Sequence, residues 1–268
     1  MNITITGNLG SGKSSVAKIL KERGYEYSST GNIFRQLAME NGLSVEEFNK
    51  KVNEAANRGD HSVDKMIDDT TTRIAKERDN VVFDSRLAWH FAPKSFKVFI
   101  ITNIDEASRR VFHDSLRVNS EVYESQEVCR KALINRQKLE TVRYQEVYHI
   151  DYYDMSNYNL VIDSTYATPA EIAQEILDKM VEYQNGNFEK MMELNPASIK
   201  FIEEVDSDLP KKDVVEVLEK GGSFSLHVGK NRLKEALAHN EKFIPVRVTG
   251  LEPGGEDGFM NFGNMVKL

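Results

Sequence analysis

The chain has 268 residues, of which 40% are hydrophobic and 29% charged, with a formal net charge of −7 and a single cysteine. The negative charge argues against a broad surface for nucleic acid or anionic lipid. One cysteine excludes an intramolecular disulfide and a cysteine zinc cluster. No apolar run approaches the roughly 20 residues that span a bilayer, and the N-terminus enters a strand without room for a signal peptide. We therefore expect a cytoplasmic protein whose partners are neither nucleic acid nor membrane.

The first fifteen residues carry the most specific motif. Residues 2–6 alternate β-branched and polar side chains, which predicts a short strand. Gly7, Gly12, Lys13 and Ser14 then fit the phosphate-loop pattern G-x-x-x-x-G-K-[ST], in which backbone N–H groups form an anion-sized hollow. A helix follows, and its N-terminus favours negative charge. The motif predicts that ATP binds here, with the lysine on the β- and γ-phosphates and the Ser14 hydroxyl on Mg²⁺. The predicted nucleotide-binding set is Gly7, Gly10, Ser11, Gly12, Lys13, Ser14 and Ser15.

Two segments in the first half of the chain carry candidate ligand contacts. A short strand at residues 25–28 precedes a turn and a helix from about Asn32 to Glu40, which places Arg35 near the end of a strand. A buried strand at residues 81–83 ends in Asp84-Ser85-Arg86. Ligands of open α/β sheets bind at the carboxyl ends of strands, so both segments are candidate contacts. The alternative for the second segment is an exposed ion pair without a role.

Further strands are predicted at residues 96–101 and 159–163, with an arginine-rich helical region between them. Single arginines on helices are most often solvated surface. Arg136, Glu140 and Arg143, however, are spaced i, i+4 and i+7, which places them on one helical face. Such a pair of arginines suits phosphoryl transfer, because charge gathers on the moving group in the transition state.

A domain boundary is predicted near residue 185. Thr168-Pro169-Ala170-Glu171 combines an N-cap, a proline at N1 and a capping-box glutamate, and an apolar stripe follows. Gln184-Asn185-Gly186-Asn187 then breaks the pattern. We expect a first domain over residues 1–184 and a second over residues 188–268.

Several segments together resemble the cytidylate kinase-like branch of the nucleoside monophosphate kinases, over about residues 1–180. They are the phosphate loop, residues 30–35, residues 83–89, Arg136 to Tyr144, and the run from Tyr148 to Asp163. The resemblance implies a three-layer α/β P-loop kinase with a parallel sheet in the order 2-3-1-4-5. It also implies an enzyme that moves the γ-phosphate of ATP, with Mg²⁺, to a small phosphorylated acceptor.

The resemblance also implies roles for individual residues. Thr30 and Arg35 match positions that hold the acceptor nucleotide and its phosphate, and Asp84 and Arg86 match a strand-end pair that contacts the acceptor. Arg136 and Arg143 match lid arginines that close over the transferring group, with Glu140 at the acidic position between them. Lys13 and these two arginines are then the catalytic residues.

The sequence departs from the family near the acceptor site. Ser85 stands where the family usually has glycine, and Trp89 directly follows Ala88, without the glycine that often precedes the tryptophan. The expected acceptor is CMP or dCMP. The alternatives are another small metabolite as acceptor, or a non-catalytic module in which nucleotide binding gates the C-terminal domain.

The C-terminal segment predicts a small α+β domain. A strand, a G-x-x-R turn made by Gly229 and Arg232, a helix and an Ile-Pro-Val-Arg-Val strand resemble a ParB/sulfiredoxin-type fold. In that fold the G-x-x-R turn binds phosphate at the helix N-terminus. Sulfiredoxin chemistry is not expected, because this segment has no cysteine.

Overall fold

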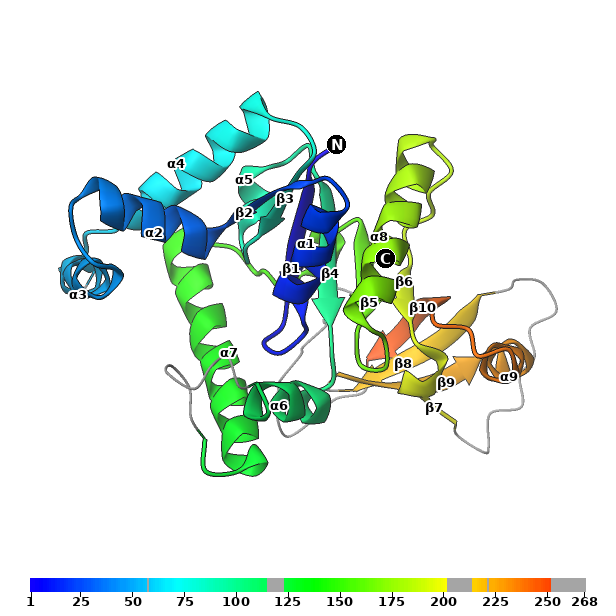
Figure 1. Cartoon of the computed structure of the whole chain (residues 1–268). Helices are drawn as coiled ribbons and strands as arrows, with labels where there is room; N and C mark the ends of the chain where they lie inside the picture. The colour runs from blue at the N-terminus through cyan, green and yellow to red at the C-terminus, as the bar shows by residue number, and fades with distance from the viewer. Residues whose placement is uncertain (57, 115–122, 202–213, 221, 252–268) are drawn as a thin grey trace. The chain divides into compact units, whose positions relative to one another are not determined.

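A computed structural model describes the chain except for residues 57, 115–122, 202–213, 221 and 252–268 (Figure 1). Contacts divide it into two compact units. The first comprises Met1–Thr6 and Ala17–Lys97, and the second comprises Gly7–Val16 and Val98–Leu268. Helix α1 (Lys13–Glu22) therefore begins in the second unit and ends in the first.

The first unit contains parallel strands and, besides the end of α1, several helices. The strands are β1 (Ile3–Gly7), β2 (Glu26–Ser29) and β3 (Val81–Asp84), and the helices are α2 (Thr30–Glu40), α3 (Val45–Ala56), α4 (Ser62–Glu77) and α5 (Ala88–Phe91). β3 lies between β1 and β2, and every residue of β1 and β3 is buried. Burial on both faces explains the apolar run of β3, Val-Val-Phe-Asp, whereas β1, Ile-Thr-Ile-Thr-Gly, alternates apolar and polar residues although all of them are buried. Helices α2, α3 and α4 share a small apolar core around Leu37 and Phe48.

In the second unit, parallel strands are followed by helices. β4 (Phe96–Ile101) pairs with β5 (Leu160–Asp163) in parallel register, with Val98 opposite Leu160. The helices are α6 (Ile104–Phe112), α7 (Gln126–Tyr148) and α8 (Pro169–Gln184), with a short 3-10 helix η2 (Met155–Asn157) before β5. α6 packs against α7, as Figure 1 shows. The capping box predicted for α8 is present, because the Thr168 hydroxyl and the Glu171 carboxylate satisfy each other's backbone N–H groups.

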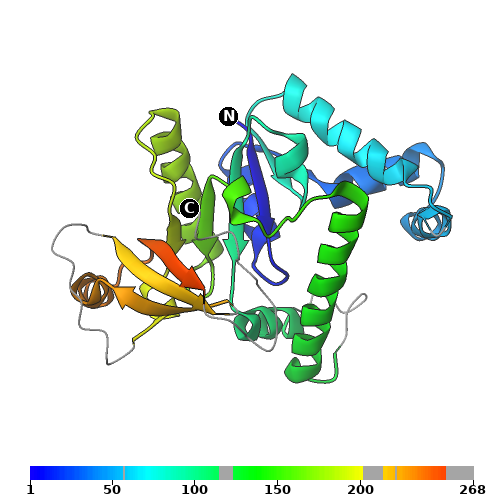
Figure 2. The same ribbon diagram turned by 180° about the vertical axis from the view of Figure 1, so that it is seen from behind.

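The C-terminal segment continues this sheet. Its elements are β6 (Met192–Leu194), η3 (Pro196–Ser198), β7 (Ile199–Lys200), β8 (Val215–Lys220), β9 (Ser223–Val228), α9 (Lys230–Ala238) and β10 (Ile244–Leu251). β6 lies parallel to β5, and β10 pairs with β6 on one side and β8 on the other. Figure 2 shows β8, β9 and β10 side by side with α9 next to them.

The predicted fold class and strand order are confirmed. The order along the sheet is β2-β3-β1-β4-β5, followed by β6-β10-β8-β9-β7. Two predicted boundaries were slightly wrong. β2 covers residues 26–29 rather than 25–28, and α2 begins at Thr30 rather than Asn32 because the Ser29 hydroxyl accepts the N–H of Asn32 as the N-cap. The division into domains at residues 184–188 stays a prediction.

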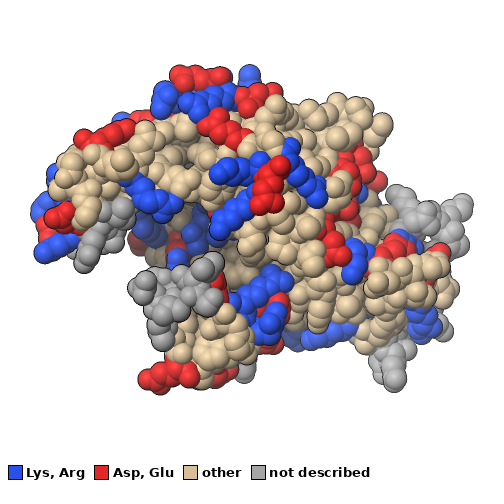
Figure 3. Space-filling model, viewed as in Figure 1, with Lys and Arg blue, Asp and Glu red and all other residues tan. Residues whose placement is uncertain are grey.

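The described surface mixes charges of both signs. Basic and acidic side chains are interspersed on the face drawn in Figure 3. Across the described part of the chain, none of the helices combines the length and apolarity required to cross a bilayer.

Candidate active site

The phosphate loop between β1 and α1 is built on two close backbone approaches. A Cβ atom at Gly7 would lie 2.5 Å from the carbonyl oxygen of Ile100, and one at Gly10 would lie 2.8 Å from the backbone of Ala107. Gly10 also has a φ of +77°, a conformation that L side chains rarely adopt. The loop therefore lies directly against β4 and α6, and only glycine fits at these two positions.

The residues predicted to bind the donor phosphates stand where the loop enters α1. Lys13 is the first residue of the helix, and Ser14 is exposed in its first turn. The backbone N–H groups of Ser15 and Val16 both donate to the carbonyl of Gly12, at 2.9 and 3.1 Å. The positive end of the helix dipole lies at this turn, where it favours bound phosphate.

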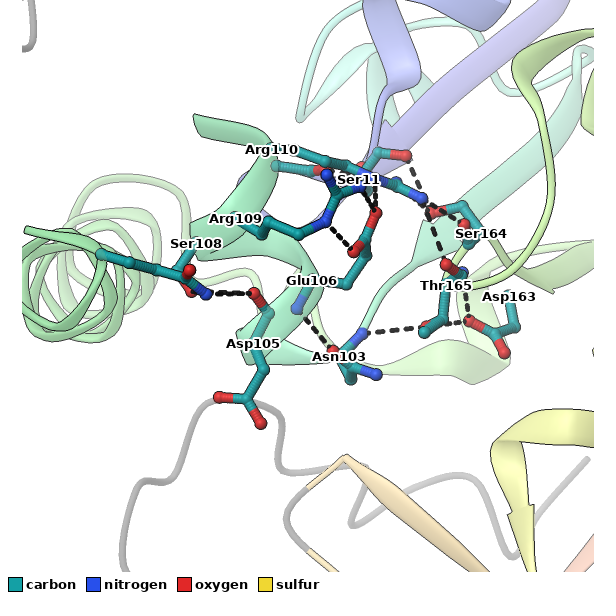
Figure 4. A network of polar contacts seen from close by, with 12 residues as sticks. Ser11, Asn103, Asp105, Glu106, Ser108, Arg109, Arg110, Asp163, Ser164 and Thr165 are labelled. Atoms are coloured by element: carbon teal, nitrogen blue, oxygen red, sulfur yellow. Dashed lines mark hydrogen bonds and ion pairs between the residues drawn. The ribbon is translucent and has the colours of Figure 1, made fainter. Parts of the chain in front are cut away.

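A polar network holds the loop from the side of β5 and α6 (Figure 4). The Ser164 hydroxyl donates to the carbonyl oxygen of Ser11 at 2.9 Å and accepts from the Arg110 guanidinium at 3.1 Å. The same guanidinium reaches the carbonyl oxygen of Gly10 at 3.5 Å and forms an ion pair with Glu106 at 2.7 Å. One hydrogen bond from Ser164 and one from Arg110 thus end on carbonyl oxygens of the loop and hold it in place.

Asn8 fixes the other side of the loop. Its side-chain amide donates to the carbonyl oxygen of Thr102 at 3.1 Å and accepts from the Thr102 N–H at 2.9 Å. Both residues are buried. This pair of hydrogen bonds ties the loop to the end of β4, just before α6 begins.

A buried carboxylate lies next to the network. Asp163 ends β5, and burial raises the pKa of its carboxyl group, while hydrogen bonds from Ser198, Thr165 and Asn195 act in the opposite direction. The Thr165 N–H and hydroxyl donate to one carboxylate oxygen at 2.8 and 2.6 Å, and the Ser198 hydroxyl donates to the other. Asp163 therefore joins the turn after β5 to η3 of the C-terminal segment.

The predicted arginine face lies on α7. Arg136 and Glu140 form an ion pair at 3.0 Å, as the i, i+4 spacing predicts. Arg143 follows on the same helix with an exposed side chain. α7 packs on α6, the helix that carries Arg110, so both belong to the unit that contains the phosphate loop.

The predicted acceptor residues lie in the other unit. Asp84 ends β3 directly opposite Ser29, the cap of α2, and Thr30 and Arg35 are exposed on that helix. The Tyr27 hydroxyl donates to the Asp84 carboxylate at 3.0 Å, and burial together with the Asp84 charge raises the pKa of Tyr27. The backbone at Arg86 is fixed by the Thr6 hydroxyl, which donates to its carbonyl oxygen at 3.2 Å. The structure thus gathers these four predicted residues at the carboxyl ends of β2 and β3.

The side chains at the start of α1 suit an Mg²⁺ ion that is bound together with a nucleotide. The cation prefers hard oxygen ligands and usually keeps several waters while it is bound by one or two protein groups and by phosphate oxygens. The exposed Ser14 hydroxyl, next to Lys13, is such a group. Among the described residues no cluster of three or more His, Cys, Asp or Glu side chains could hold a metal by itself.

Sequence reasoning missed several residues that shape the site. Arg110 was one of several arginines in a helical region, and only its spacing from Glu106 hinted at a fixed position. Asn8 occupies a position that the motif leaves free, and Ser164 lies far outside the motif, so no local pattern identifies either residue. A phosphate site at Gly229 and Arg232, which the resemblance of the C-terminal segment implies, stays a prediction. Gly229 does open α9, but the Arg232 guanidinium binds the Glu241 carboxylate through two hydrogen bonds of 2.7 and 2.6 Å.

The sheet order and the loop together define a P-loop kinase: a glycine-rich phosphate loop joins the first strand to the first helix, and arginines lie on helices of the same unit. Comparison with known families agrees. Residues 2–166 match the model of the cytidylate kinase-like family. The chain belongs to this family, and it is an enzyme.

Individual relatives show how far the likeness extends. The chain is 34% identical over 166 residues to a cytidylate kinase from Methanococcoides burtonii, which covers 62% of this chain and 88% of that protein. It is 33% identical over 187 residues to an S-adenosylmethionine-dependent nucleotide dehydratase from Lacinutrix mariniflava, which covers 69% of this chain but 36% of that protein. A solved shikimate kinase from Acinetobacter baumannii superimposes with a TM-score of 0.44 at 16% identity and covers 68% of this chain and 94% of that one.

Proposed function

We propose that this kinase transfers the γ-phosphoryl group of ATP to a nucleoside monophosphate, CMP or dCMP, and releases ADP. The observation that carries the proposal is the phosphate loop, which is held against β4, β5 and α6 with its carbonyls engaged. The family match and the relatives named cytidylate kinase support the choice of acceptor.

On the donor side, backbone N–H groups of the loop bind the β- and γ-phosphates and Lys13 neutralises their charge. The N–H groups of Ser11 and Ser15 instead donate to carbonyl oxygens within the loop. Ser14 would hold the Mg²⁺ that accompanies ATP. When bound, this cation neutralises charge on the phosphate oxygens.

In the transfer step, an oxygen of the acceptor's phosphate attacks the γ-phosphorus as the bond to the β–γ bridging oxygen breaks, and ADP leaves. The acceptor is already an anionic nucleophile, so the step needs no strong general base. Positioning and charge neutralisation then account for the rate. Arg136 and Arg143 supply the neutralising charge to the moving group, and Glu140 orients the Arg136 guanidinium at 3.0 Å.

On the acceptor side, Arg35 binds the monophosphate and Thr30, Asp84 and Arg86 contact the nucleotide. The Asp84 carboxylate is fixed by the Tyr27 hydroxyl, which leaves it suited to accept hydrogen bonds from a sugar or base. Ser85 between Asp84 and Arg86 adds a side chain where glycine is usual, so this turn sets which acceptor fits.

The direct test measures ADP release by the full-length chain with ATP and Mg²⁺ against CMP, dCMP, UMP, AMP, dTMP and simple hydroxylated metabolites. Turnover highest with CMP or dCMP supports the proposal. Turnover highest with a hydroxylated metabolite would show that the chain is a kinase for that metabolite instead. Tight ATP binding without turnover on any acceptor would indicate a nucleotide-gated module instead.

A variant pair tests the role of the loop lysine. Lys13→Ala removes the charge on the donor phosphates, and we expect turnover to fall about 100-fold or more with little change in Tm. Lys18→Ala, on the exposed side of the same helix, is the matched control. Unchanged kcat in Lys13→Ala would contradict the assigned role.

A further inference from the structure

The C-terminal segment contacts the kinase strands through the buried carboxylate of Asp163. This residue ends β5 and is 2% exposed. The Ser198 hydroxyl, at the end of η3, donates to one carboxylate oxygen, and the backbone N–H of Asn195 donates to the carboxylate as well. Both donors lie beyond residue 166, where the match to the family model ends. The C-terminal segment therefore supplies part of the hydrogen bonding that a buried carboxylate requires.

The other bonds of Asp163 shape the turn after β5. One carboxylate oxygen accepts the N–H of Thr165 at 2.8 Å and its hydroxyl at 2.6 Å. These two bonds close the turn around Ser164, the residue between them. The N–H of Ser164 donates to the carbonyl oxygen of Ile101 in β4 at 2.8 Å. The turn, and with it the Ser164 side chain, is thus held in place by the Asp163 carboxylate and by β4.

Two routes lead from this turn to the phosphate loop (Figure 4). In the first, the Ser164 hydroxyl donates to the carbonyl oxygen of Ser11 at 2.9 Å. In the second, the Thr165 hydroxyl accepts the N–H of Asn103 at 3.1 Å, and Asn103 caps α6. That helix carries the guanidinium that reaches the carbonyl oxygen of Gly10 at 3.5 Å. Both routes lie within the second compact unit, so a change in the turn reaches the loop that binds the donor phosphates.

Loss of the Ser198 donor would affect the turn directly. Because the Asp163 carboxylate is almost completely buried, bulk water does not readily replace a lost donor, and an under-bonded buried charge is costly. The carboxylate relieves this cost by moving toward other donors. The donors on its other oxygen belong to Thr165, so the turn moves with it.

We propose that Ser198 is a positioning residue of this kinase: through Asp163 and the turn after β5, it holds the phosphate loop in the geometry that binds ATP. Ser198 acts on the loop through other residues rather than by touching the nucleotide. The inference rests on the part of the proposed function that places ATP at the loop, and not on the identity of the acceptor.

The test uses the full-length chain and two measurements. The amide NMR signals of Gly10 and Gly12 report the geometry of the loop without ligand, and calorimetric titration gives the Kd for ATP with Mg²⁺. Ser198→Ala removes the donor, and Ser198→Thr keeps a hydroxyl at this half-buried position. Ile199→Val, at the next residue, is the matched control, because it trims a buried apolar side chain of the same segment and leaves the hydroxyl of Ser198 in place.

We expect Ser198→Ala to shift both glycine signals and to raise the Kd for ATP about fivefold. Ser198→Thr and Ile199→Val should leave both signals near their wild-type positions and change the Kd less than about twofold. In a Ser164→Ala background, Ser198→Ala should weaken ATP binding less than it does in the wild type, because one of the two routes is already broken.

Unshifted glycine signals in Ser198→Ala would overturn the inference, and so would an unchanged Kd when the wild type binds ATP. Equal shifts in Ser198→Ala and Ile199→Val would overturn it too, because they would indicate a general loss of stability in the C-terminal segment. A wild-type chain that does not bind ATP would contradict the proposed function instead, and the glycine signals would still decide whether Ser198 positions the loop.

Discussion

Ser164, the first residue after β5, donates its hydroxyl hydrogen to the carbonyl oxygen of Ser11 in the phosphate loop, 153 residues earlier in the chain, at 2.9 Å. The loop therefore depends on a turn that follows the last kinase strand. Since Ser164 also accepts from Arg110, one hydroxyl links the loop, β5 and α6.

Replacement of this hydroxyl tests the link. In Ser164→Ala we expect the KM for ATP to rise several-fold and the free energy of unfolding to fall by about 1–2 kcal/mol, because a buried carbonyl and a guanidinium lose their partner. Steady-state kinetics and urea denaturation measure both. Ser44→Ala removes the cap of α3, at a comparable cost in stability, far from the loop in sequence. An equal rise in KM in both variants would point to a general loss of stability.

Gly10→Ala separates a steric clash from backbone strain. A methyl group at Gly10, where φ is +77°, would meet the backbone of Ala107 at 2.8 Å, so we expect loss of ATP binding and a large drop in Tm. Gly59 has a similar φ of +81° with nothing within 4 Å, and Gly59→Ala therefore costs only the strain, about 1–2 kcal/mol. Calorimetric titration with ATP and thermal unfolding compare the two, and similar effects would show that the contact with Ala107 is not tight.

Arg110→Lys keeps the charge but loses the planar fork that reaches Ser164, Gly10 and Glu106. Lysine cannot form this set of bonds, so we expect kcat/KM for ATP to fall about tenfold. The adjacent Arg109 also pairs with Glu106 but is more exposed, at 56% against 26%. Arg109→Lys is therefore the control and should change kcat/KM less than twofold. A larger fall in kcat/KM in Arg109→Lys than in Arg110→Lys would contradict the role given to Arg110 in holding the loop.

The stability of the fold should depend on pH through Glu219. Burial raises the pKa of this carboxyl from 4.5 to about 7, and the Gly222 N–H bond only partly offsets the effect. Between these values the unfolded chain ionises first and binds fewer protons than the folded chain. Stability therefore falls as pH rises from about 4.5 to 7 and is constant, for this group, outside that window.

Glu219→Gln keeps an acceptor for Gly222 and removes the charge. We expect this variant to lose less stability than the wild type between pH 4.5 and 7, by at most about 3 kcal/mol. Guanidinium denaturation across this range measures the difference. The control is Glu235→Gln, at an exposed position of α9, which should show the same dependence of stability on pH as the wild type. Parallel curves for wild type and Glu219→Gln would refute the proposed origin of the pH dependence.

Local patterns predicted the loop, the ion pair between Arg136 and Glu140 and the capping box of α8, and each of these depends on residues within one helix turn, one loop or one motif. The order of the first five strands was predicted from the resemblance to a kinase family instead. Arg110 and Ser164 lie 54 residues apart, and their contact depends on the pairing of β4 with β5, which no local pattern records. The contact between the Arg232 guanidinium and the Glu241 carboxylate was likewise not predicted, and phosphate binding at the Arg232 motif stays a prediction.

The pairing of β6 with β5 has a consequence for truncation. A chain cut after α8 would leave β5, an apolar strand of sequence Leu-Val-Ile-Asp, as an open edge with unpaired backbone groups. It would also remove Ser198 and Asn195, two of the donors that satisfy the buried Asp163. Exposed edges of this kind template association with other chains. Insolubility of such a fragment would therefore reflect the exposed edge of β5 rather than a loss of the catalytic groups.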